Sequence, residues 1–245
     1  MKIRTALTIA GSDSGGGAGI QADLKTFADH GVYGMSVITA ITAQNSLGIR
    51  ALQLVAAELV ADQLRAVLDD FPVHAIKTGM LANAGIIHAI CDVFERLPSL
   101  PPVVVDPVLV AKDGTPLLDD AARDALIHRL IPLACITTPN LPELTILQEL
   151  PGTLLIKGGH ADGKLVTDRL IQNECITMYQ HRRIRSKNTH GTGCTLSAAI
   201  AARLALGDTV PDACRRSIAY VSSLIRRSRD SIGSGSGPLL HILRS

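Results

Sequence analysis

The sequence has few aromatic residues, and this limits the partners it can recognise by stacking. Its 245 residues include three Phe, three Tyr and no Trp, which leaves little with which to stack nucleic-acid bases. Residues 180–245 are basic, but their Arg residues lie among apolar residues at helical spacing. We therefore expect a solvated helix face there, or a surface that attracts a compact anion, and no nucleic acid partner.

The sequence also lacks the cysteine and histidine patterns of disulfide-linked and zinc-binding proteins. Its five cysteines form an odd, scattered set without a C-x-x-C pair, and no two of its eight histidines have metal-ligand spacing. This pattern indicates reduced thiols in a cytoplasm, four of them as small apolar fillers. Lys77 and Arg203 interrupt the later apolar stretches, so we expect no signal peptide and no membrane span.

Short β-rich runs alternate with amphipathic helical patterns from one end of the sequence to the other. This alternation is typical of βαβ units, so we predict a single α/β domain over residues 1–245, with a mainly parallel central sheet and helices on both faces. Strands are expected over residues 6–10, 36–43, 75–78, 103–106, 136–138 and 153–157. Helices are expected over residues 19–30, 59–70, 84–96, 121–130, 192–206 and 212–228.

Two further segments extend this pattern. Alternation between residues 165 and 184, around Gln172 and Asn173, predicts an antiparallel hairpin appended to the sheet. The Gly-Ser run at residues 233–237 has the composition of a flexible linker, but apolar residues follow it. A loop that covers a site is the other interpretation.

Two glycine-rich segments stand out. The first, residues 11–19, follows the first strand, and its glycines allow a backbone to approach a ligand closely. Its spacing fits neither a dinucleotide fingerprint nor a Walker loop, so a generic tight turn is the alternative. In the second, Gly191, Thr192 and Gly193 precede Cys194 and an apolar helix. Free N–H groups at that helix start would form an anion hole for a phosphoryl group, whereas a plain capped helix would need only one Ser or Thr.

Polar residues follow three of the predicted strands. Asp106 follows the strand at 103–106, Asn140 and Glu143 follow the next, and Lys157 ends the strand at 153–157 before two glycines. Ligands of open α/β sheets collect at these carboxyl ends. Asp106, Asn140 and Glu143 together could hold a hydrated Mg²⁺ beside a triphosphate, although each alone is more often a helix cap. Lys157 could reach phosphate oxygens.

Taken together, the motifs resemble one family nearly from end to end. They are A-G-S-D-S-G-G-G-A-G-I-Q-A-D-L-K-T, T-A-Q-N, K-T-G-M-L, V-V-D-P-V, T-P-N-L-P-E, K-G-G-H, N-T-H-G-T-G-C-T and G-S-G-P-L-L-H. In this order they resemble the hydroxymethylpyrimidine/phosphomethylpyrimidine kinases. The resemblance implies a ribokinase-like fold, ATP as cosubstrate with Mg²⁺, two successive phosphorylations in thiamine biosynthesis, and a homodimer.

The resemblance also implies roles for individual residues. Gln44 would read the pyrimidine edge, and four further residues would line the substrate pocket: Gly11, Asp23, Met80 and Val108. Four residues would face the nucleotide: Asn140, Lys157, Thr192 and Gly193. Cys194 would be the catalytic base, beside the anion hole of Gly191 and Gly193 with Lys157, and Asp106 and Glu143 would hold the metal.

One segment departs from the family pattern. Only residues 144–153 separate Glu143 from the K-G-G-H strand, where the family has an additional helical segment. Two alternative functions remain. A pyridoxal-type kinase would share the fold and the phosphate apparatus, and a non-catalytic pyrimidine-binding protein would have lost the use of ATP through this shortened segment.

Overall fold

The computed structural model describes residues 3–110, 118–229 and 232–241, and a nine-stranded sheet runs through them in the order β3-β2-β1-β4-β5-β6-β7-β8-β9. The six strands from β2 to β7 are parallel, whereas β3 at one edge and β8 and β9 at the other are antiparallel. The strands are β1 (Thr5–Asp13), β2 (Tyr33–Asn45), β3 (Gly48–Leu54), β4 (Ile76–Thr78), β5 (Val103–Val105), β6 (Ile136–Thr137), β7 (Leu154–Ile156), β8 (Leu165–Gln172) and β9 (Cys175–Arg182).

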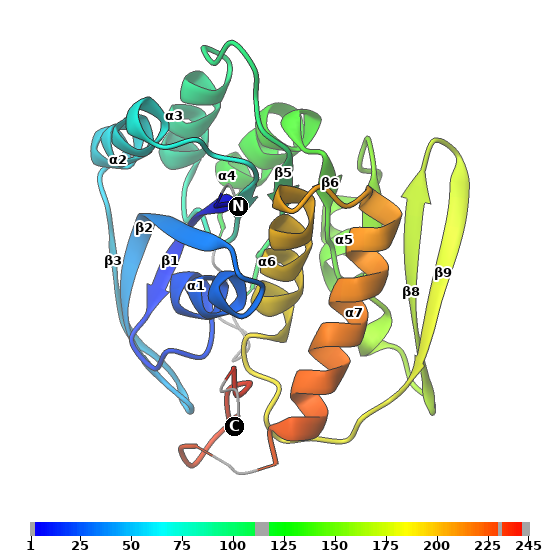
Figure 1. Cartoon of the computed structure of the whole chain (residues 1–245). Helices are drawn as coiled ribbons and strands as arrows, with labels where there is room; N and C mark the ends of the chain where they lie inside the picture. Colours follow the sequence, from blue (N-terminus) through cyan, green and yellow to red (C-terminus); the bar gives the residue numbers. More distant parts are fainter. Residues whose placement is uncertain (1–2, 111–117, 230–231, 242–245) are drawn as a thin grey trace.

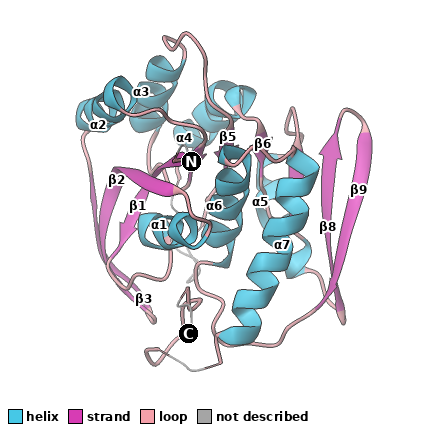
Figure 2. Ribbon diagram, viewed as in Figure 1, coloured by secondary structure: helices cyan, strands magenta, loops and turns pink. Residues whose placement is uncertain are grey.

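Helices cover both faces of this sheet (Figures 1 and 2). One face carries α1 (Gly19–Asp29), α6 (Thr192–Ala205) and α7 (Val210–Arg227). The other carries α2 (Ala57–Asp70), α3 (Ala84–Phe94), α4 (Asp120–Ala125) and α5 (Leu141–Leu147). Successive residues of a strand point to opposite faces, so Val103 and Val105 of β5 belong to the core with α3, and Val104 belongs to the core with α6.

All six predicted core strands and six predicted helices are present, with ends shifted by a few residues. The Asn83 side chain accepts a hydrogen bond from the Ile86 N–H and caps α3. The hairpin of β8 and β9 also matches its prediction, and its turn residues Asn173 and Glu174 both have positive φ. The mainly parallel α/β sheet is therefore confirmed.

Three features differ from the prediction. The exposed strand β3 was not expected, because an edge strand open to solvent lacks an apolar pattern. The helix predicted over residues 121–130 is α-helical only to Ala125 and continues as a π-helical turn, Leu126–Leu130. Cys175 is exposed, so it is not an apolar filler, although all five cysteines are free thiols.

The parallel strands bring the polar residues of the sequence to one edge of the sheet. β1, β4, β5, β6 and β7 all end on the same side, because parallel strands share a direction. The residues that follow them, together with the start of α6, therefore lie near one another. Within the described ranges, no helix is long and apolar enough to cross a membrane.

Candidate active site

A cavity of about 740 Å³ lies at the carboxyl ends of the parallel strands. Twelve of the thirteen residues that the sequence marks as candidates line it, namely Gly11, Gln44, Met80, Asp106, Val108, Asn140, Glu143, Lys157, Gly191, Thr192, Gly193 and Cys194. The cavity therefore joins the segments that the sequence connects with substrate to those that it connects with phosphate. Asp23 is the candidate that it leaves out.

Asp13 organises the first glycine-rich segment. Its carboxylate is 3% exposed and accepts hydrogen bonds from the backbone N–H groups of Gly15, Gly17 and Ala18 at 2.8–3.0 Å. His190 lies on its other side, with 3.0 Å between His190 Nε2 and Asp13 Oδ2. Although burial raises the pKa of Asp13, the hydrogen bond from His190 and the backbone N–H groups lower it below the usual value. An ionised carboxylate therefore joins the two glycine-rich segments.

The glycines of these two segments allow the two loops to pack closely against each other. A side chain at Gly191 would collide with the carbonyl oxygen of Gly17, and one at Gly17 would collide with the His190 ring. Gly191 also has φ of +77°, a conformation that L side chains rarely adopt. Part of the glycine content that suggested close approach to a ligand is thus explained by close packing of the two loops.

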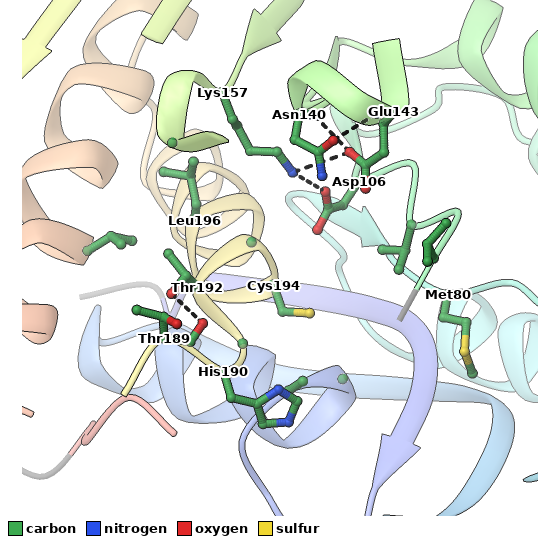
Figure 3. A pocket seen from close by; sticks show the side chains of 18 of the residues that line it. Met80, Asp106, Asn140, Glu143, Lys157, Thr189, His190, Thr192, Cys194 and Leu196 are labelled. Carbon is green, nitrogen blue, oxygen red and sulfur yellow. Dashed lines mark hydrogen bonds and ion pairs between the residues drawn. The ribbon is translucent and has the colours of Figure 1, made fainter. Parts of the chain in front are cut away.

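The start of α6 has backbone features that an anion hole requires. Gly191 is its N-cap without a side-chain hydrogen bond, and the Thr192 hydroxyl turns back to the carbonyl oxygen of Thr189 at 2.8 Å. The N–H groups of the first helical turn are thus left without a capping side chain, at the positive end of the helix dipole. Figure 3 shows Cys194 and Thr192 at this helix start, with Lys157 and the carboxylates of Asp106 and Glu143 nearby.

The surroundings of Cys194 favour its protonated thiol over the thiolate. Burial raises its pKa to about 11, and Lys77 and a hydrogen bond from the Gly19 N–H offset this only in part. Asp23 and Asp106 raise the pKa further. The helix dipole is thus outweighed by desolvation and by two nearby carboxylates.

Within the cavity, Lys157 lies between the carboxylates of Asp106 and Glu143. Its Nζ is 2.8 Å from Asp106 Oδ1 and 3.8 Å from Glu143 Oε2. Thr138 and Ser197 also donate hydrogen bonds to the Asp106 carboxylate. Burial raises the pKa of Asp106, but the charges of Lys157 and Lys77 and the hydrogen bonds from Lys157 and Thr138 together outweigh burial, so the pKa lies below the usual value. For Glu143, burial prevails and raises the pKa to about 7.

Asn140 and Glu143 cap the helix α5 in addition to lining the cavity. The Asn140 side chain accepts from the Glu143 N–H, and the Glu143 carboxylate accepts from the Asn140 N–H, which makes a reciprocal capping box. No cluster of three His, Cys, Asp or Glu suited to a metal occurs among the described residues. Two carboxylates near a phosphate site nevertheless fit Mg²⁺, which binds one or two carboxylates and completes its shell with water and phosphate oxygens.

The β2–β3 pair positions Gln44. The register between these strands shifts between Ala43 and Gln44, and such a bulge redirects the side chain that follows it. The Gln44 amide is half-buried at the cavity wall, with its oxygen 3.2 Å from the Thr42 hydroxyl and its nitrogen 3.5 Å from His190 Nε2. A polar, weakly engaged amide thus faces the end of the cavity opposite Lys157.

Asp23 does not line the substrate pocket, so that expectation is wrong. Its side chain is fully buried below the cavity and accepts from Thr8 Oγ1 at 2.6 Å and from Lys77 Nζ at 2.8 Å. Lys77, Asp13 and His190 line the cavity but were not proposed from the sequence. Of these three residues, only Lys77 could have been identified from the sequence, because a lysine within an apolar strand is unusual unless its charge is paired.

The cavity wall combines aliphatic side chains with polar ones, the latter including His160, Asp168, His181 and Arg183. Among the described residues that line it, none is Phe or Tyr, and the wall includes Ile146, Val166, Leu196, Ile218, Val221 and Ile225. After α5, only Gln148–Thr153 lead to β7. The loop at 233–237 packs beside Ser46 and His190. The Ser236 N–H donates a hydrogen bond to the Ser46 carbonyl, and the His190 N–H donates one to the Gly237 carbonyl. It is a packed loop beside the site and not a linker.

The comparisons with known proteins agree with this arrangement. The family model described as phosphomethylpyrimidine kinase matches residues 13–153 and 146–240, two segments that meet at the short connection after α5. A hydroxymethylpyrimidine/phosphomethylpyrimidine kinase of Rhizobium meliloti (strain 1021) is 45% identical over 260 residues, covering 98% of this chain and 97% of that protein. The alignment is longer than this chain, so the relative has residues that the chain lacks.

Two further similarities extend the comparison. The thiamine biosynthesis bifunctional protein ThiED of Geobacter sulfurreducens is 44% identical over 97% of this chain and 52% of its own length. Among solved structures, the ADP complex of Bacillus subtilis pyridoxal kinase is 34% identical, covers 98% of each chain and has a TM-score of 0.89.

Proposed function

The chain belongs to the phosphomethylpyrimidine kinase family, with its ribokinase-like fold, and is a kinase of thiamine biosynthesis; from this premise we propose how its residues act. ATP phosphorylates 4-amino-5-hydroxymethyl-2-methylpyrimidine, and then its monophosphate gives the diphosphate. One observation carries this proposal. The helix start at Gly191–Cys194, Lys157 and the amide of Gln44 face one cavity, so a phosphate site and a heterocycle site lie within reach of each other.

Gln44 would bind the aminopyrimidine. Its amide offers both a donor and an acceptor, which matches a ring nitrogen and an adjacent amino group. Gly11, Met80 and Val108 would line the flat faces of the ring, since all three line the same cavity. The absence of a side chain at Gly11 leaves room for the end of Met80, because a Cβ there would collide with it.

The nucleotide would lie at the Lys157 end of the cavity. Thr192 and Gly193 would offer backbone N–H groups to the phosphates, and Asn140 would lie beside them. Asp106 and Glu143 would hold Mg²⁺, which when bound neutralises charge on the phosphates. Lys157, which pairs with these two carboxylates, would also reach the phosphate oxygens.

Cys194 would act as the general base of the first phosphorylation. Its thiolate takes the proton of the substrate hydroxyl, the hydroxyl oxygen attacks the γ-phosphorus, and the bond from that phosphorus to the β-phosphate oxygen breaks to release ADP. Because phosphoryl transfer depends mainly on positioning and charge, the anion hole and Lys157 would contribute alongside the base.

Pyridoxal is a second candidate substrate, because the similarity to a pyridoxal kinase covers nearly the whole chain. Identity of 45% to the R. meliloti enzyme against 34% to that kinase favours the pyrimidine. The test measures ADP release with hydroxymethylpyrimidine, its monophosphate and pyridoxal in parallel. Turnover of pyridoxal alone would overturn the proposal, and binding of the pyrimidine without any turnover would identify a non-catalytic binding protein.

The protein would act as a cytoplasmic homodimer. Five free thiols are expected in a reducing compartment. Strand β3 lies at one edge of the sheet, and its Leu52 and Leu54 are 44% and 42% exposed. An edge strand with exposed leucines is normally covered. A second copy of this chain would cover it.

A further inference from the structure

His190 lines the cavity but has no part in the chemistry described so far. Its Nε2 lies 3.0 Å from Asp13 Oδ2 and 3.5 Å from the amide nitrogen of Gln44, the side chain proposed to bind the pyrimidine. One ring nitrogen therefore faces both a carboxylate and the amide that would read the substrate. Figure 3 shows the ring of His190 beside the start of α6, where Cys194 lies.

The Asp13 carboxylate determines that His190 Nε2 carries a hydrogen. Three backbone N–H groups already donate to this carboxylate, those of Gly15, Gly17 and Ala18. An ionised carboxylate can only accept, so the contact at 3.0 Å requires a donor on the His190 side. With its hydrogen directed at Asp13, His190 Nε2 has no lone pair to offer. It therefore cannot accept a hydrogen from the Gln44 amide.

The opposite end of the amide has a similar mismatch. Gln44 Oε1 lies 3.2 Å from the Thr42 hydroxyl, but that hydroxyl has a single hydrogen and lies closer, at 2.8 Å, to the Ser12 carbonyl oxygen. A hydroxyl that donates to Ser12 can only accept from the amide. A half-turn of the amide resolves both ends, because its nitrogen then donates to Thr42 and its oxygen faces the N–H of His190. The hydrogen bonds around an amide decide which of its ends is the oxygen, and here they favour this orientation.

This orientation also directs the reactive group of the substrate. In hydroxymethylpyrimidine, the amino group lies between the ring nitrogen that Gln44 would bind and the carbon that carries the hydroxymethyl group. With the amide oxygen on the His190 side, the amino group lies on that side and the hydroxymethyl group lies beyond it. His190 directly precedes Gly191, the N-cap of α6. The hydroxymethyl group would thus point to the helix start, whereas the opposite orientation of the amide would point it away.

We propose that His190 is a positioning residue for substrate specificity: held by Asp13, it fixes the orientation of the Gln44 amide, so that the site selects an amino-substituted pyrimidine over an oxo-substituted one. The inference rests on the proposed role of Gln44. A pyrimidinone presents a carbonyl oxygen and a ring N–H, the reverse of the aminopyrimidine edge, so a fixed amide meets it oxygen to oxygen and N–H to N–H. A glutamine that is free to turn would bind either edge.

The test compares the affinities of the full chain for hydroxymethylpyrimidine and for its 4-oxo analogue, in which a carbonyl replaces the amino group, by calorimetric titration. His190→Leu removes the donor beside the amide. It should lower the ratio of the two affinities by about tenfold or more, since a site that pairs its polar groups with one ligand rejects the analogue that mispairs them. His190→Gln keeps an amide donor near the position of Nε2 and should retain the ratio.

Three further variants keep the test decisive. Thr42→Val preserves the volume but removes the hydroxyl at the other end of the amide, so it should also lower the ratio, and Thr42→Ser is its matched control. This pair decides the case in which His190→Leu does not fold. Lys25→Met removes a lysine that donates to the Gly16 carbonyl. It loosens the same glycine-rich segment without touching the amide, and the ratio should not change.

A ratio that falls in His190→Leu and is retained in His190→Gln would support the proposal. An unchanged ratio in His190→Leu, or an equal fall in both variants, would overturn it, because a merely structural contact weakens the binding of both pyrimidines alike. The measurement needs no kinase activity. Binding of hydroxymethylpyrimidine without turnover would count against the proposed function alone, whereas an unchanged ratio would count against this inference alone.

Discussion

At the scale of single residues, Gln44 is the side chain whose replacement best separates substrate binding from nucleotide binding. Gln44→Leu should weaken binding of hydroxymethylpyrimidine by about 1–3 kcal/mol, since polar groups of the ring then lose their partners in a half-buried site. ATP binding should change little, because Gln44 lies at the end of the cavity opposite Lys157. Calorimetric titration with each ligand measures both. Equal losses would contradict the assignment.

Cys194 permits a sharper prediction, because the two phosphorylations need a base to different degrees. A hydroxyl must lose its proton in the first step, whereas the phosphate oxygen that attacks in the second is already largely ionised near neutral pH. Cys194→Ala should therefore slow the first step by about 10²–10⁴-fold and the second step much less. Single-turnover rates with each substrate measure the two steps separately. A near-normal rate of the first step in the folded Cys194→Ala variant would show that Cys194 is not the base.

The residues that sequence reasoning missed share a physical cause. Asp13 and His190 are 177 positions apart, and the contact between them arises only when two loops pack together. The role predicted for Asp23 was wrong because a sequence motif shows that a residue is needed. It does not show whether the side chain faces a ligand or a neighbouring lysine. Lys157, Asp106 and Glu143 were found because parallel strands bring their carboxyl ends to one edge.

At the scale of elements, the contact between the two glycine-rich loops can be tested with a pair of glycines. Gly191→Ala adds a Cβ that collides with the Gly17 carbonyl, whereas at Gly207, with φ of +95°, no atom lies within 4 Å. Gly207→Ala should cost only the strain of its backbone, about 1 kcal/mol, and leave ATP binding intact. Gly191→Ala should lower the melting temperature further and abolish ATP binding. Equal effects in both assays would show that the loops are not in tight contact.

The short connection after α5 predicts how the base of the nucleotide is recognised. No aromatic side chain among the described cavity residues can stack on the base, and aliphatic side chains such as Ile146 and Val166 contact different bases alike. GTP and CTP should therefore support turnover at rates comparable to that with ATP. Competition kinetics with the three nucleotides provide the measurement, and a strict preference for ATP would mean that another element reads the base.

The buried strands could be predicted from the sequence, whereas the exposed edge strand β3 and the break in the helix after Ala125 could not. Strands β1, β4 and β5 are buried apolar runs, so their pattern is unmistakable. By contrast, β3 is exposed along most of its length, and its pairing with β2 depends on the turn at Ser46 and Leu47. The π-helical turn after Ala125 leaves no trace in residue propensities, since the same residues also favour an α-helix.

For the whole molecule, the exposed edge of the sheet leads to a prediction about assembly. Leu52→Lys should convert a dimer into a monomer, because a charge opposes burial of the edge strand against a second copy. Sedimentation of the wild type and the variant at equal concentration measures this, and Ile176→Lys on the opposite edge strand β9, where Ile176 is 60% exposed, is the matched control. A wild-type monomer, or a Leu52→Lys dimer, would contradict the proposed interface.

Segments from opposite ends of the chain form the site together, and this has a consequence for the folding of the chain during its synthesis. Asp13 meets His190, and Ser46 meets Gly235, which lies 189 positions later. Contacts so distant in sequence form slowly, and a chain emerging from the ribosome makes them only after its last third has appeared. A nascent chain that has already folded β1, β2 and α1 would still be unable to bind its substrates. Substrate binding is therefore expected only of chains that have been synthesised through Gly235.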